Sequence, residues 1–331
     1  STRKAISLKP DVPEAYTNLG SILMDQGKFM ETEISLIKAI TIKPDFGKAY
    51  YYLSSLPYTK NINKWQNKLF SKNILNNQLK ENQVNIYFAR ANILHKEKKY
   101  VESSKYLLLA NKVKLNLKKS NYRSLVNKSK VLFTKSEKKD SKQKQYTKYP
   151  ISIFIVGMPR SGSTLLESIL SMNKIVHDLG EINILEESFL EKEKNNKKLS
   201  LAELYWKKID RNTNKLKITT NKWLYNYMYT GIIVQQIPNA KIIHCYRNPL
   251  DNILSIYRTN FAKGNTFSSS LVDCAKVYLD QETLMTQYKN KFRSKIYDLN
   301  YDLLVKDPNK ETKSLISWLG LEWNESYLSP H

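Results

Sequence analysis

The sequence is poor in cysteine, histidine and glycine, and it has no long apolar run. Two cysteines, four histidines and nine glycines occur among its 331 residues. Two cysteines are too few for a disulfide framework and lack the spacing of a zinc site, so we expect a reducing, cytoplasmic compartment and no bound metal. No apolar stretch approaches the roughly 20 residues that a membrane helix needs. Disulfide-rich, zinc-binding and membrane-spanning classes of protein are therefore disfavoured.

Acidic residues are scarce as well. The chain has 54 lysines and arginines against 30 aspartates and glutamates, which gives a formal net charge of +24 at pH 7. Such a balance favours an anionic partner, of which nucleic acid, lipid and a small substrate are the main kinds. The lysines are spread through every segment and accompany no nucleic-acid-binding motif. We therefore expect a solvated basic surface rather than a nucleic-acid site.

The N-terminal part of the chain repeats itself with a period of 34 residues. Three pairs of segments show the period: Lys4-Ala5-Ile6 with Lys38-Ala39-Ile40, Lys9-Pro10-Asp11 with Lys43-Pro44-Asp45, and Ala15-Tyr16 with Ala49-Tyr50. This is the period of the tetratricopeptide repeat, in which antiparallel helix pairs stack into a solenoid. We predict such an array over residues 1–133, and we expect it to be cut at its N-terminus because Ser1 falls inside a repeat.

Neither the array nor the segment after it indicates a function by itself. The concave face of such a solenoid binds peptides or a partner chain, but an array can equally support a neighbouring domain or a homodimer, and the residues favour neither reading. Residues 134–149 are lysine-rich and almost without apolar side chains, so we expect an exposed connector there. The alternative with a specific function is that this segment is a nucleic-acid-binding arm.

From Pro150 onward, apolar strands alternate with helical segments. The clearest strands are Ile151–Val156 and Ala240–Tyr246, and helices are expected at Glu181–Glu191 and Leu250–Phe261. This alternation predicts an α/β domain in which a mainly parallel sheet lies between two layers of helices. The predicted fold is thus a helical repeat solenoid followed by a three-layer α/β/α domain.

The turn after the first strand has most features of a phosphate-binding loop. Gly157 and Gly162 are separated by four residues, and Ser163-Thr164 opens an amphipathic helix whose free N–H groups and dipole attract an anion. The lysine of the P-loop pattern is missing, because Ser163 stands in its place and Arg160 is the nearest cation. A nucleoside triphosphatase needs that lysine at its phosphates. The loop therefore favours a less highly charged group, such as a phosphosulfate.

Two more cations follow predicted strands. Lys222 ends the segment Thr220-Asn221-Lys222, and Arg247 begins Arg247-Asn248-Pro249 directly after the second clear strand. Because ligands of open α/β folds bind at the carboxyl ends of the strands, we expect Arg160, Lys222 and Arg247 to converge on a ligand with several anionic groups. The alternatives are an ordinary surface lysine for Lys222 and an ion pair of Arg247 with Asp251.

The segment Ile151–Glu181 resembles the 5′-phosphosulfate-binding region of sulfotransferases, because it combines Pro-Arg-Ser-Gly-Ser-Thr at 159–164 with the pair Gly180-Glu181. With its repeats, the chain is similar to bacterial tetratricopeptide-repeat sulfotransferases and to the tyrosylprotein branch of the family. The resemblance implies 3′-phosphoadenosine-5′-phosphosulfate (PAPS) as sulfuryl donor, no metal, and a hydroxyl acceptor on a peptide, glycan, lipid or small molecule.

The resemblance also implies a role for each residue of the donor site. Arg160 and Lys222 would hold the phosphosulfate, Arg247 and Ser255 the 3′-phosphate, and Tyr301 the nucleotide. The remaining donor-binding residues would be Ser161, Gly162, Ser163 and Thr164. Asn248 replaces the aspartate that the family usually has after this arginine, and Asp302 replaces a glutamate after this tyrosine.

The general base is the assignment on which the reaction depends most. Glu181 matches the glutamate that serves as base in the tyrosylprotein branch, so the implied catalytic set is Glu181, Lys222 and Arg160. His177, four residues earlier, is the alternative, because another branch of sulfotransferases uses histidine. Elsewhere, a histidine inside a strand, such as His244, is typical of a core residue.

Two functions of other classes stay open. One is a P-loop kinase or nucleotide hydrolase, against which the missing lysine argues. The other is a non-catalytic repeat scaffold with a decayed transferase domain. The sulfotransferase-like domain is expected over residues 150–331, and it is expected to be C-terminally incomplete because relatives continue beyond a segment like Leu319–Trp323.

Overall fold

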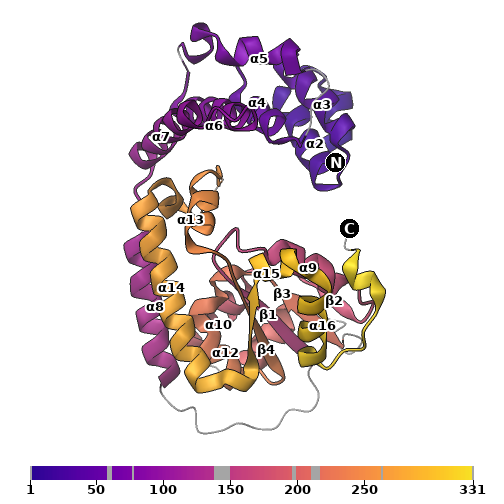
Figure 1. The fold of residues 1–331 in the computed structure, drawn as a ribbon, viewed down its shortest axis with the longest axis vertical. Coiled ribbons are helices and arrows are strands. Elements are labelled where there is room, and N and C mark those ends of the chain that lie inside the picture. Colours follow the sequence, from indigo (N-terminus) through magenta and orange to yellow (C-terminus); the bar gives the residue numbers. More distant parts are fainter. Residues whose placement is uncertain are drawn as a thin grey trace. The chain divides into compact units, whose positions relative to one another are not determined.

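The chain forms two compact units (Figure 1). The computed structural model describes residues 2–57, 62–76, 78–137, 150–195, 199–209, 217–261 and 264–329. The first unit, called here the helical unit, comprises Ser1–Asn121 and Tyr257–Leu271. The second, called the sheet unit, comprises Tyr122–Ile256 and Val272–His331.

The helical unit is built from antiparallel helix pairs. Its helices are α1 (Thr2–Leu8), α2 (Pro13–Asp25), α3 (Phe29–Ile42), α4 (Gly47–Ser55), α5 (Ile62–Phe70), α6 (Lys80–Lys96) and α7 (Tyr100–Leu117). Helix α2 packs on α3, α4 on α6, and α6 on α7. Small residues allow the close approach: a Cβ added to Gly20 would lie 2.8 Å from the Leu36 side chain. The predicted helical repeat architecture is confirmed.

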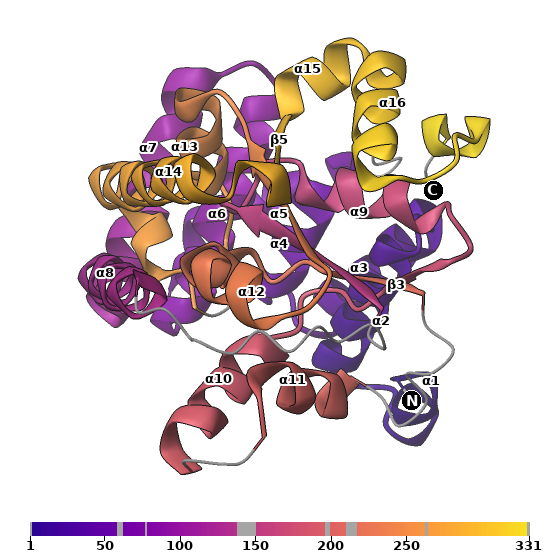
Figure 2. The ribbon, with the colours of Figure 1, turned by 90° about the horizontal axis from the view of Figure 1, so that it is seen from below.

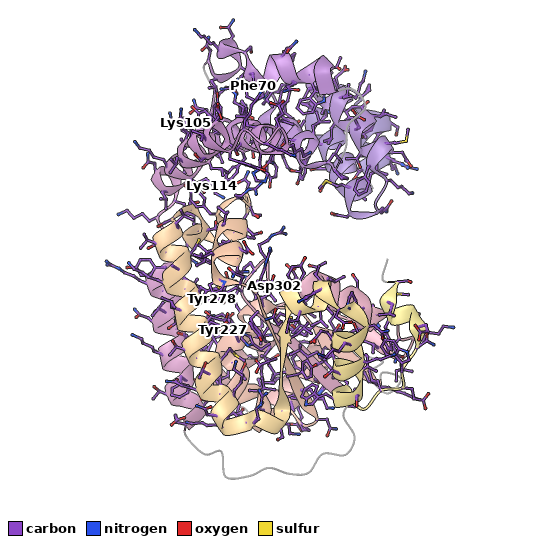
Figure 3. The ribbon with its side chains drawn as sticks, viewed as in Figure 1. Phe70, Lys105, Lys114, Tyr227, Tyr278 and Asp302 are labelled. Atoms are coloured by element: carbon purple, nitrogen blue, oxygen red, sulfur yellow. The ribbon has the colours of Figure 1, made fainter. Side chains whose placement is uncertain are left out.

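A buried arginine connects the end of α5 with the α6–α7 pair. Arg90 on α6 is only 5 % exposed. Its Nε donates to the carbonyl of Leu69 and its Nη2 to that of Ser71, both at 2.9 Å. Its guanidinium also lies 5.7 Å from the ring centroid of Phe70, labelled in Figure 3, and 5.3 Å from that of Tyr106. The Arg90 side chain therefore fixes the end of α5 to the α6–α7 pair.

The described part of the sheet unit contains a five-stranded sheet. Its strands are β1 (Ile151–Gly157), β2 (Val176–Asp178), β3 (Ile218–Asn221), β4 (Ala240–Tyr246) and β5 (Ile296–Asn300). They lie in the order β2-β3-β1-β4-β5, and every neighbouring pair is parallel. The predicted parallel sheet is therefore confirmed.

Alternating side chains of the strands bury against helices on both faces of the sheet. Phe154 and Val156 pack in one core and Ile153 and Ile155 in the other. The first core includes residues of α8 (Tyr122–Glu137), α10 (Ile184–Asn195), α11 (Leu201–Ile209), α12 (Thr230–Gln236) and α14 (Leu271–Phe292). The second includes residues of α9 (Ser163–Ser171), α15 (Tyr301–Lys306) and α16 (Pro308–Leu319). Figure 2 shows α9 and α16 on one side of the sheet and α10, α11 and α12 on the other.

Both cysteines lie inside the protein. Cys245 on β4 and Cys274 on α14 are not joined in a disulfide, and both residues are fully buried. Burial raises the pKa of both thiols, that of Cys274 to about 12. Among the described residues, no helix has both the length and the apolar character needed to cross a membrane.

Three segment boundaries differ from those expected from the sequence. Helix α8 runs through Thr134–Glu137, since Leu132 and Phe133 pack into the sheet-unit core, so the connector predicted over 134–149 does not begin at 134. Residues 138–149 lie outside the described residues. Helix α10 begins at Ile184 rather than Glu181, and α13 (Pro249–Tyr257) ends before Phe261. The domain limits at 133 and 150 stay predictions, while the compact units divide after Asn121.

Replacing Arg90 by alanine should destabilise the helical unit. The change leaves the carbonyls of Leu69 and Ser71 without these donors and removes the cation from two aromatic rings, a loss of about 2–4 kcal/mol in the free energy of unfolding. Urea unfolding followed by circular dichroism measures the effect. The exposed Arg3 gives the matched control, Arg3→Ala, which should change stability by less than about 0.5 kcal/mol. Equal midpoints for the two variants would contradict the role given to Arg90.

Candidate active site

The site forms at the carboxyl edge of the sheet, where three neighbouring strands end. Strand β1 lies between β3 and β4. Lys222 follows β3, Arg160 follows β1 in the loop to α9, and Arg247 follows β4. The three cations predicted from the sequence thus leave adjacent strand ends on the same edge of the sheet.

The loop between β1 and α9 has an unusual backbone. Gly157, Arg160 and Gly162 all have positive φ, with values of 144°, 68° and 91°. At Gly157 a side chain is excluded, because an added Cβ would lie 2.2 Å from the carbonyl oxygen of Cys245 on β4. Arg160 adopts a conformation that L-residues rarely use, and such strain concentrates at functional sites. Alternating backbone turns of this kind aim main-chain N–H groups at an anion.

Helix α13 holds this loop from one side. Asn252, fully buried on α13, donates from Nδ2 to the carbonyl of Pro159 at 3.0 Å. One turn later on the same helix, the Ser255 hydroxyl accepts from Arg160 Nε at 3.2 Å. The structure therefore joins the two sequence motifs, one carrying Arg160 and the other carrying Ser255, through a direct hydrogen bond.

Tyr301 contacts the loop from the start of α15. A Cβ added to Gly162 would lie 2.0 Å from the Tyr301 ring, so this ring rests directly on the glycine. The Arg247 guanidinium lies 5.1 Å from the centroid of the same ring. Asn300 caps α15 by accepting from the N–H groups of Asp302 and Leu303. Tyr301 thereby connects the phosphate-binding loop with the arginine that follows β4.

Two nearby carboxylates partly neutralise the charge of Arg247. Its Nε lies 3.7 Å from an Asp302 carboxylate oxygen, and its Nη2 lies 4.0 Å from Asp251, the i,i+4 pair considered from the sequence. The buried Nε makes no hydrogen bond among the described residues. Tyr278, shown with Asp302 in Figure 3, donates to the main-chain carbonyl of Arg247 at 3.1 Å. This arginine is fixed in place and keeps hydrogen-bonding capacity for a ligand.

Lys222 is buried among oxygen atoms. The residue is 6 % exposed, and its ammonium lies 2.9 Å from Glu181, 3.3 Å from Glu167 and 3.4 Å from the Thr164 hydroxyl. Burial favours loss of the proton, but the hydrogen bond with Glu181 and the charges of Glu167 and Glu181 outweigh it, so the pKa of Lys222 is raised. The lysine therefore stays charged and is not an ordinary surface residue.

The sequence analysis missed Glu167. It is 6 % exposed on α9, and burial raises its pKa to about 7, with a contribution from a hydrogen bond to Asp178 and an opposing effect of Lys222. A signal was present, since Ser163, Leu166, Glu167 and Leu170 share the buried face at helical spacing. A carboxyl group in such an apolar stripe needs polar partners, and here those partners are Asp178 and Lys222.

Glu181 stands on a turn that the neighbouring strand fixes. The Lys222 N–H donates to the carbonyl of Gly180 at 3.0 Å, and the Leu179 N–H donates to that of Thr220. The Asp178 carboxylate accepts from the Gly180 N–H. The Glu181 side chain is 62 % exposed, so one side of its carboxylate meets Lys222 and the other remains accessible.

The histidines lie in different surroundings. His177 is exposed on β2 and, because side chains alternate along a strand, it points to the opposite face from Asp178, the neighbour of Glu167. His244 is fully buried, and its ring atoms pair with Asp298 at 3.2 Å and with Gln281 at 2.8 Å. The described residues contain no group of three or more His, Cys, Asp or Glu side chains that could hold a metal.

Glu167→Gln should flatten the pH dependence of stability. Between 4.5, its ordinary pKa, and about 7, the folded chain binds more protons at Glu167 than the unfolded chain does. The free energy of unfolding of the wild type therefore falls as pH rises through this window, and the amide removes that contribution. Urea unfolding at pH 5, 6, 7 and 8 measures it. Glu187→Gln, at a side chain 58 % exposed, serves as control and should keep the wild-type slope. An unchanged slope in Glu167→Gln would refute the assignment.

Comparison with known proteins agrees with these features. The model of a protein family described as "Sulfotransferase family" matches residues 150–325, and a tetratricopeptide repeat model matches residues 13–46. An uncharacterised protein of Aquifex aeolicus (strain VF5) is 28 % identical over 277 residues, covering 75 % of this chain. The chain spans 36 % of that relative's length.

Among solved structures, the similar ones include two sulfotransferase domains. One is from the Synechococcus PCC 7002 olefin synthase, at 17 % identity over 58 % of this chain and 81 % of that one, with a TM-score of 0.43. The other is from the curacin biosynthetic pathway, at 19 % identity over 56 % and 79 %, with a TM-score of 0.42. The family model covers more than half of the chain, including β1 to β5 and the loop that carries Arg160, and by that match the chain belongs to the sulfotransferase family.

Proposed function

We propose that this protein transfers a sulfuryl group from PAPS to a hydroxyl acceptor, with Glu181 as general base. The observation that carries the proposal is the grouping of Arg160, Lys222 and Arg247 at three adjacent strand ends, around an anion-binding loop without the P-loop lysine. A donor with a 5′-phosphosulfate and a 3′-phosphate carries anionic groups at two positions of its ribose. Three separated cations suit such a donor better than a single lysine-centred phosphate loop would.

The unsatisfied donors of the site fit such a ligand. The Ser161 hydroxyl is buried, at 2 % exposure for the residue, and has no hydrogen-bond partner among the described residues. The buried Nε of Arg247 likewise has no hydrogen-bond partner among the described residues. Groups of this kind cost free energy unless a partner arrives, and phosphate or sulfonate oxygens are suitable partners. Arg160, Ser161, Gly162, Ser163 and Thr164 would hold the phosphosulfate end.

The 3′-phosphate end would be held on the other side of the loop. Arg247 would supply the charge and Ser255 a hydroxyl, while Tyr301 would lie against the nucleotide. The hydrogen bond between Arg160 and Ser255 supports this division, because it keeps the residues assigned to the two ends within reach of one ligand.

Bound PAPS would supply the sulfuryl group as an electrophile. Lys222, which its two carboxylate neighbours keep charged, would stabilise negative charge on the oxygen that leaves with the nucleotide. Arg160 would share this task from the loop. Glu167 does not reach the ligand in this proposal and acts through Lys222, whose ammonium it orients.

Glu181 would take the proton from the acceptor hydroxyl. Its carboxylate is more than half exposed, lies 2.9 Å from the Lys222 ammonium and can meet an acceptor from solvent. His177 is the weaker candidate, since its side chain lies on the other face of the edge strand β2. Peptide, glycan, lipid and small-molecule hydroxyls all remain within the proposal.

Binding of the product nucleotide 3′-phosphoadenosine-5′-phosphate (PAP) tests the donor site. Arg247→Ala should weaken PAP binding by about 10- to 100-fold, because a charge-assisted hydrogen bond contributes about 1.5–3 kcal/mol. Isothermal titration calorimetry gives the affinity. Arg293→Ala is the control, since that side chain is 69 % exposed and pairs with Asp298 outside the site. Undetectable binding by the wild type, or an unchanged affinity in Arg247→Ala, would overturn the assignment.

Glu181→Gln tests the base. The amide keeps the size of the side chain but does not take up a proton, so kcat should fall by about 10²- to 10⁴-fold while PAP affinity stays within a few-fold. Transfer from radiolabelled PAPS to a panel of phenols, tyrosine peptides and sugars measures the rate. The parallel variant His177→Gln should retain most activity. A larger loss in His177→Gln than in Glu181→Gln would transfer the role to the histidine.

A further inference from the structure

The segment Tyr257–Leu271 belongs to the helical unit, although the sulfotransferase family model spans it. It begins with the last residue of α13, the helix that carries Asn252 and Ser255, and it ends at the first residue of α14. The chain thus leaves the sheet unit directly after the helix that holds the phosphate-binding loop. The contacts of this segment indicate what the helical unit does.

The first anchor is Tyr257. Its ring packs in an apolar cluster of the helical unit that includes Phe88, Leu107 and Ala110. Asn111 on α7, only 1 % exposed, donates from Nδ2 to the main-chain carbonyl of Tyr257 at 3.1 Å. The end of α13 is therefore held both by apolar packing and by a buried hydrogen bond.

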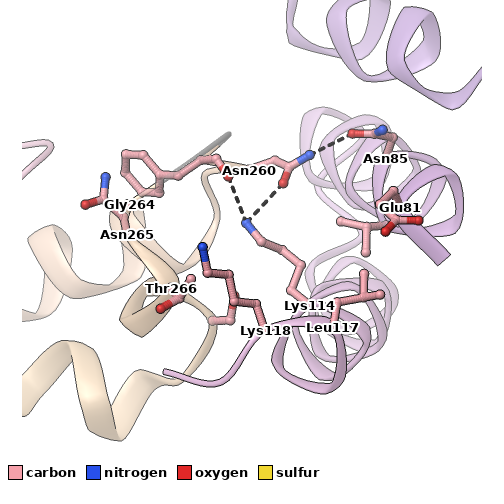
Figure 4. A pocket seen from close by; sticks show the side chains of 12 residues that line it. Glu81, Asn85, Lys114, Leu117, Lys118, Asn260, Gly264, Asn265 and Thr266 are labelled. Carbon is pink, nitrogen blue, oxygen red and sulfur yellow. Dashed lines mark hydrogen bonds between the residues drawn. The ribbon is translucent and has the colours of Figure 1, made fainter. Parts of the chain in front are cut away.

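The second anchor surrounds Asn260. Lys114 on α7 donates to the Asn260 side chain at 3.1 Å and to the carbonyl of Phe261 at 3.3 Å, as the dashed lines in Figure 4 show. Asn260 in turn donates from Nδ2 to Asn85 at 2.8 Å, and its N–H donates to the Tyr51 hydroxyl at 3.3 Å. Burial of the Lys114 ammonium away from water lowers its pKa to about 8.

The third anchor is Asn121. Its Nδ2 donates to the carbonyl of Gly264 at 2.9 Å, and its Oδ1 accepts from the Thr266 hydroxyl and from the Phe267 N–H, both at 3.0 Å. The Phe267 residue is fully buried. A single amide side chain thus satisfies three groups of the segment.

The three anchors share a mode of recognition. Side chains of α4, α7 and the residue before α8 bind main-chain groups at 257, 260, 261, 264 and 267. The segment contains the 3-10 helix Thr266–Ser269 and is held largely through its main chain, as a receptor holds a bound peptide. Here the bound peptide is part of the same chain.

We propose that the helical repeat unit positions the donor site by holding Tyr257–Leu271, so that Asn111, Lys114 and Asn121 are positioning residues for PAPS binding. The inference rests on the proposed function of the site. Fixing the backbone of a segment costs conformational entropy, and the contacts with the helical unit offset that cost before any donor binds. The end of α13 is then ordered in advance.

Loss of the anchors would act on the donor through α13. Asn252 and Ser255 on this helix hold the carbonyl of Pro159 and the side chain of Arg160. If α13 were ordered in only a fraction of the molecules, the apparent affinity for the donor would equal the intrinsic affinity multiplied by that fraction. The helical unit would then control donor affinity through the order of α13.

The test compares two alanine variants in the intact chain. Asn121→Ala removes three hydrogen bonds to the segment, whereas Asn92→Ala removes one hydrogen bond to Ser54 inside the helical unit and none to the segment. PAP affinity by calorimetry should fall about 10-fold in Asn121→Ala and stay unchanged in Asn92→Ala. Asn121→Asp keeps the acceptor for Thr266 and Phe267 and should recover part of the affinity.

Hydrogen–deuterium exchange without any ligand gives an independent readout. Amides of α13 and of residues 264–271 should exchange faster in Asn121→Ala than in the wild type or in Asn92→Ala. If Asn121→Ala loses helical content by circular dichroism, Lys114→Met takes its place. A wild type that does not bind PAP would refute the proposed function, and the exchange rates would still decide whether the helical unit orders α13. Unchanged exchange in α13, or faster exchange with unchanged PAP affinity, would overturn it.

Discussion

The site depends most on one interaction, the contact of the buried Lys222 ammonium with oxygens of Glu181, Glu167 and Thr164. A cation taken out of water is tolerated only where opposite charge and hydrogen-bond acceptors replace the lost hydration. Here the acceptors come from α9 and from the turn after β2, while the lysine follows β3. One side chain therefore aligns a helix, a turn and a strand end that are distant in sequence.

The sequence was sufficient for the parts of the site whose signals are local. The apolar runs of β1 and β4, the glycines of the loop and the cations after three strands all lie within short segments, and the structure has them where the periodicity predicts. Glu167 was missed because its importance appears only when α9 meets Lys222. Helix α8 was assigned to the array, whereas it belongs to the sheet unit and its Leu132 packs in the same core as Phe154 of β1.

The helical unit shows the same limit more clearly. A period of 34 residues was enough to predict stacked helix pairs, and it says nothing of what those helices bind. Asn111, Lys114 and Asn121 are ordinary polar residues in the sequence, and their partners lie about 145 residues away. Helix α13 ends at Tyr257, whose ring packs in the apolar cluster of the helical unit. The helix propensities of the residues that follow do not predict this end.

The burial of Cys245 and Cys274 has a practical consequence. Thiols that are enclosed and have raised pKa values react slowly with maleimides, because the thiolate is the reactive form. A cysteine introduced at an exposed position would therefore take up a fluorophore selectively, with both natural cysteines left in place. Dye pairs for distance measurements by energy transfer can thus be attached to either unit without redesigning the interior of the protein.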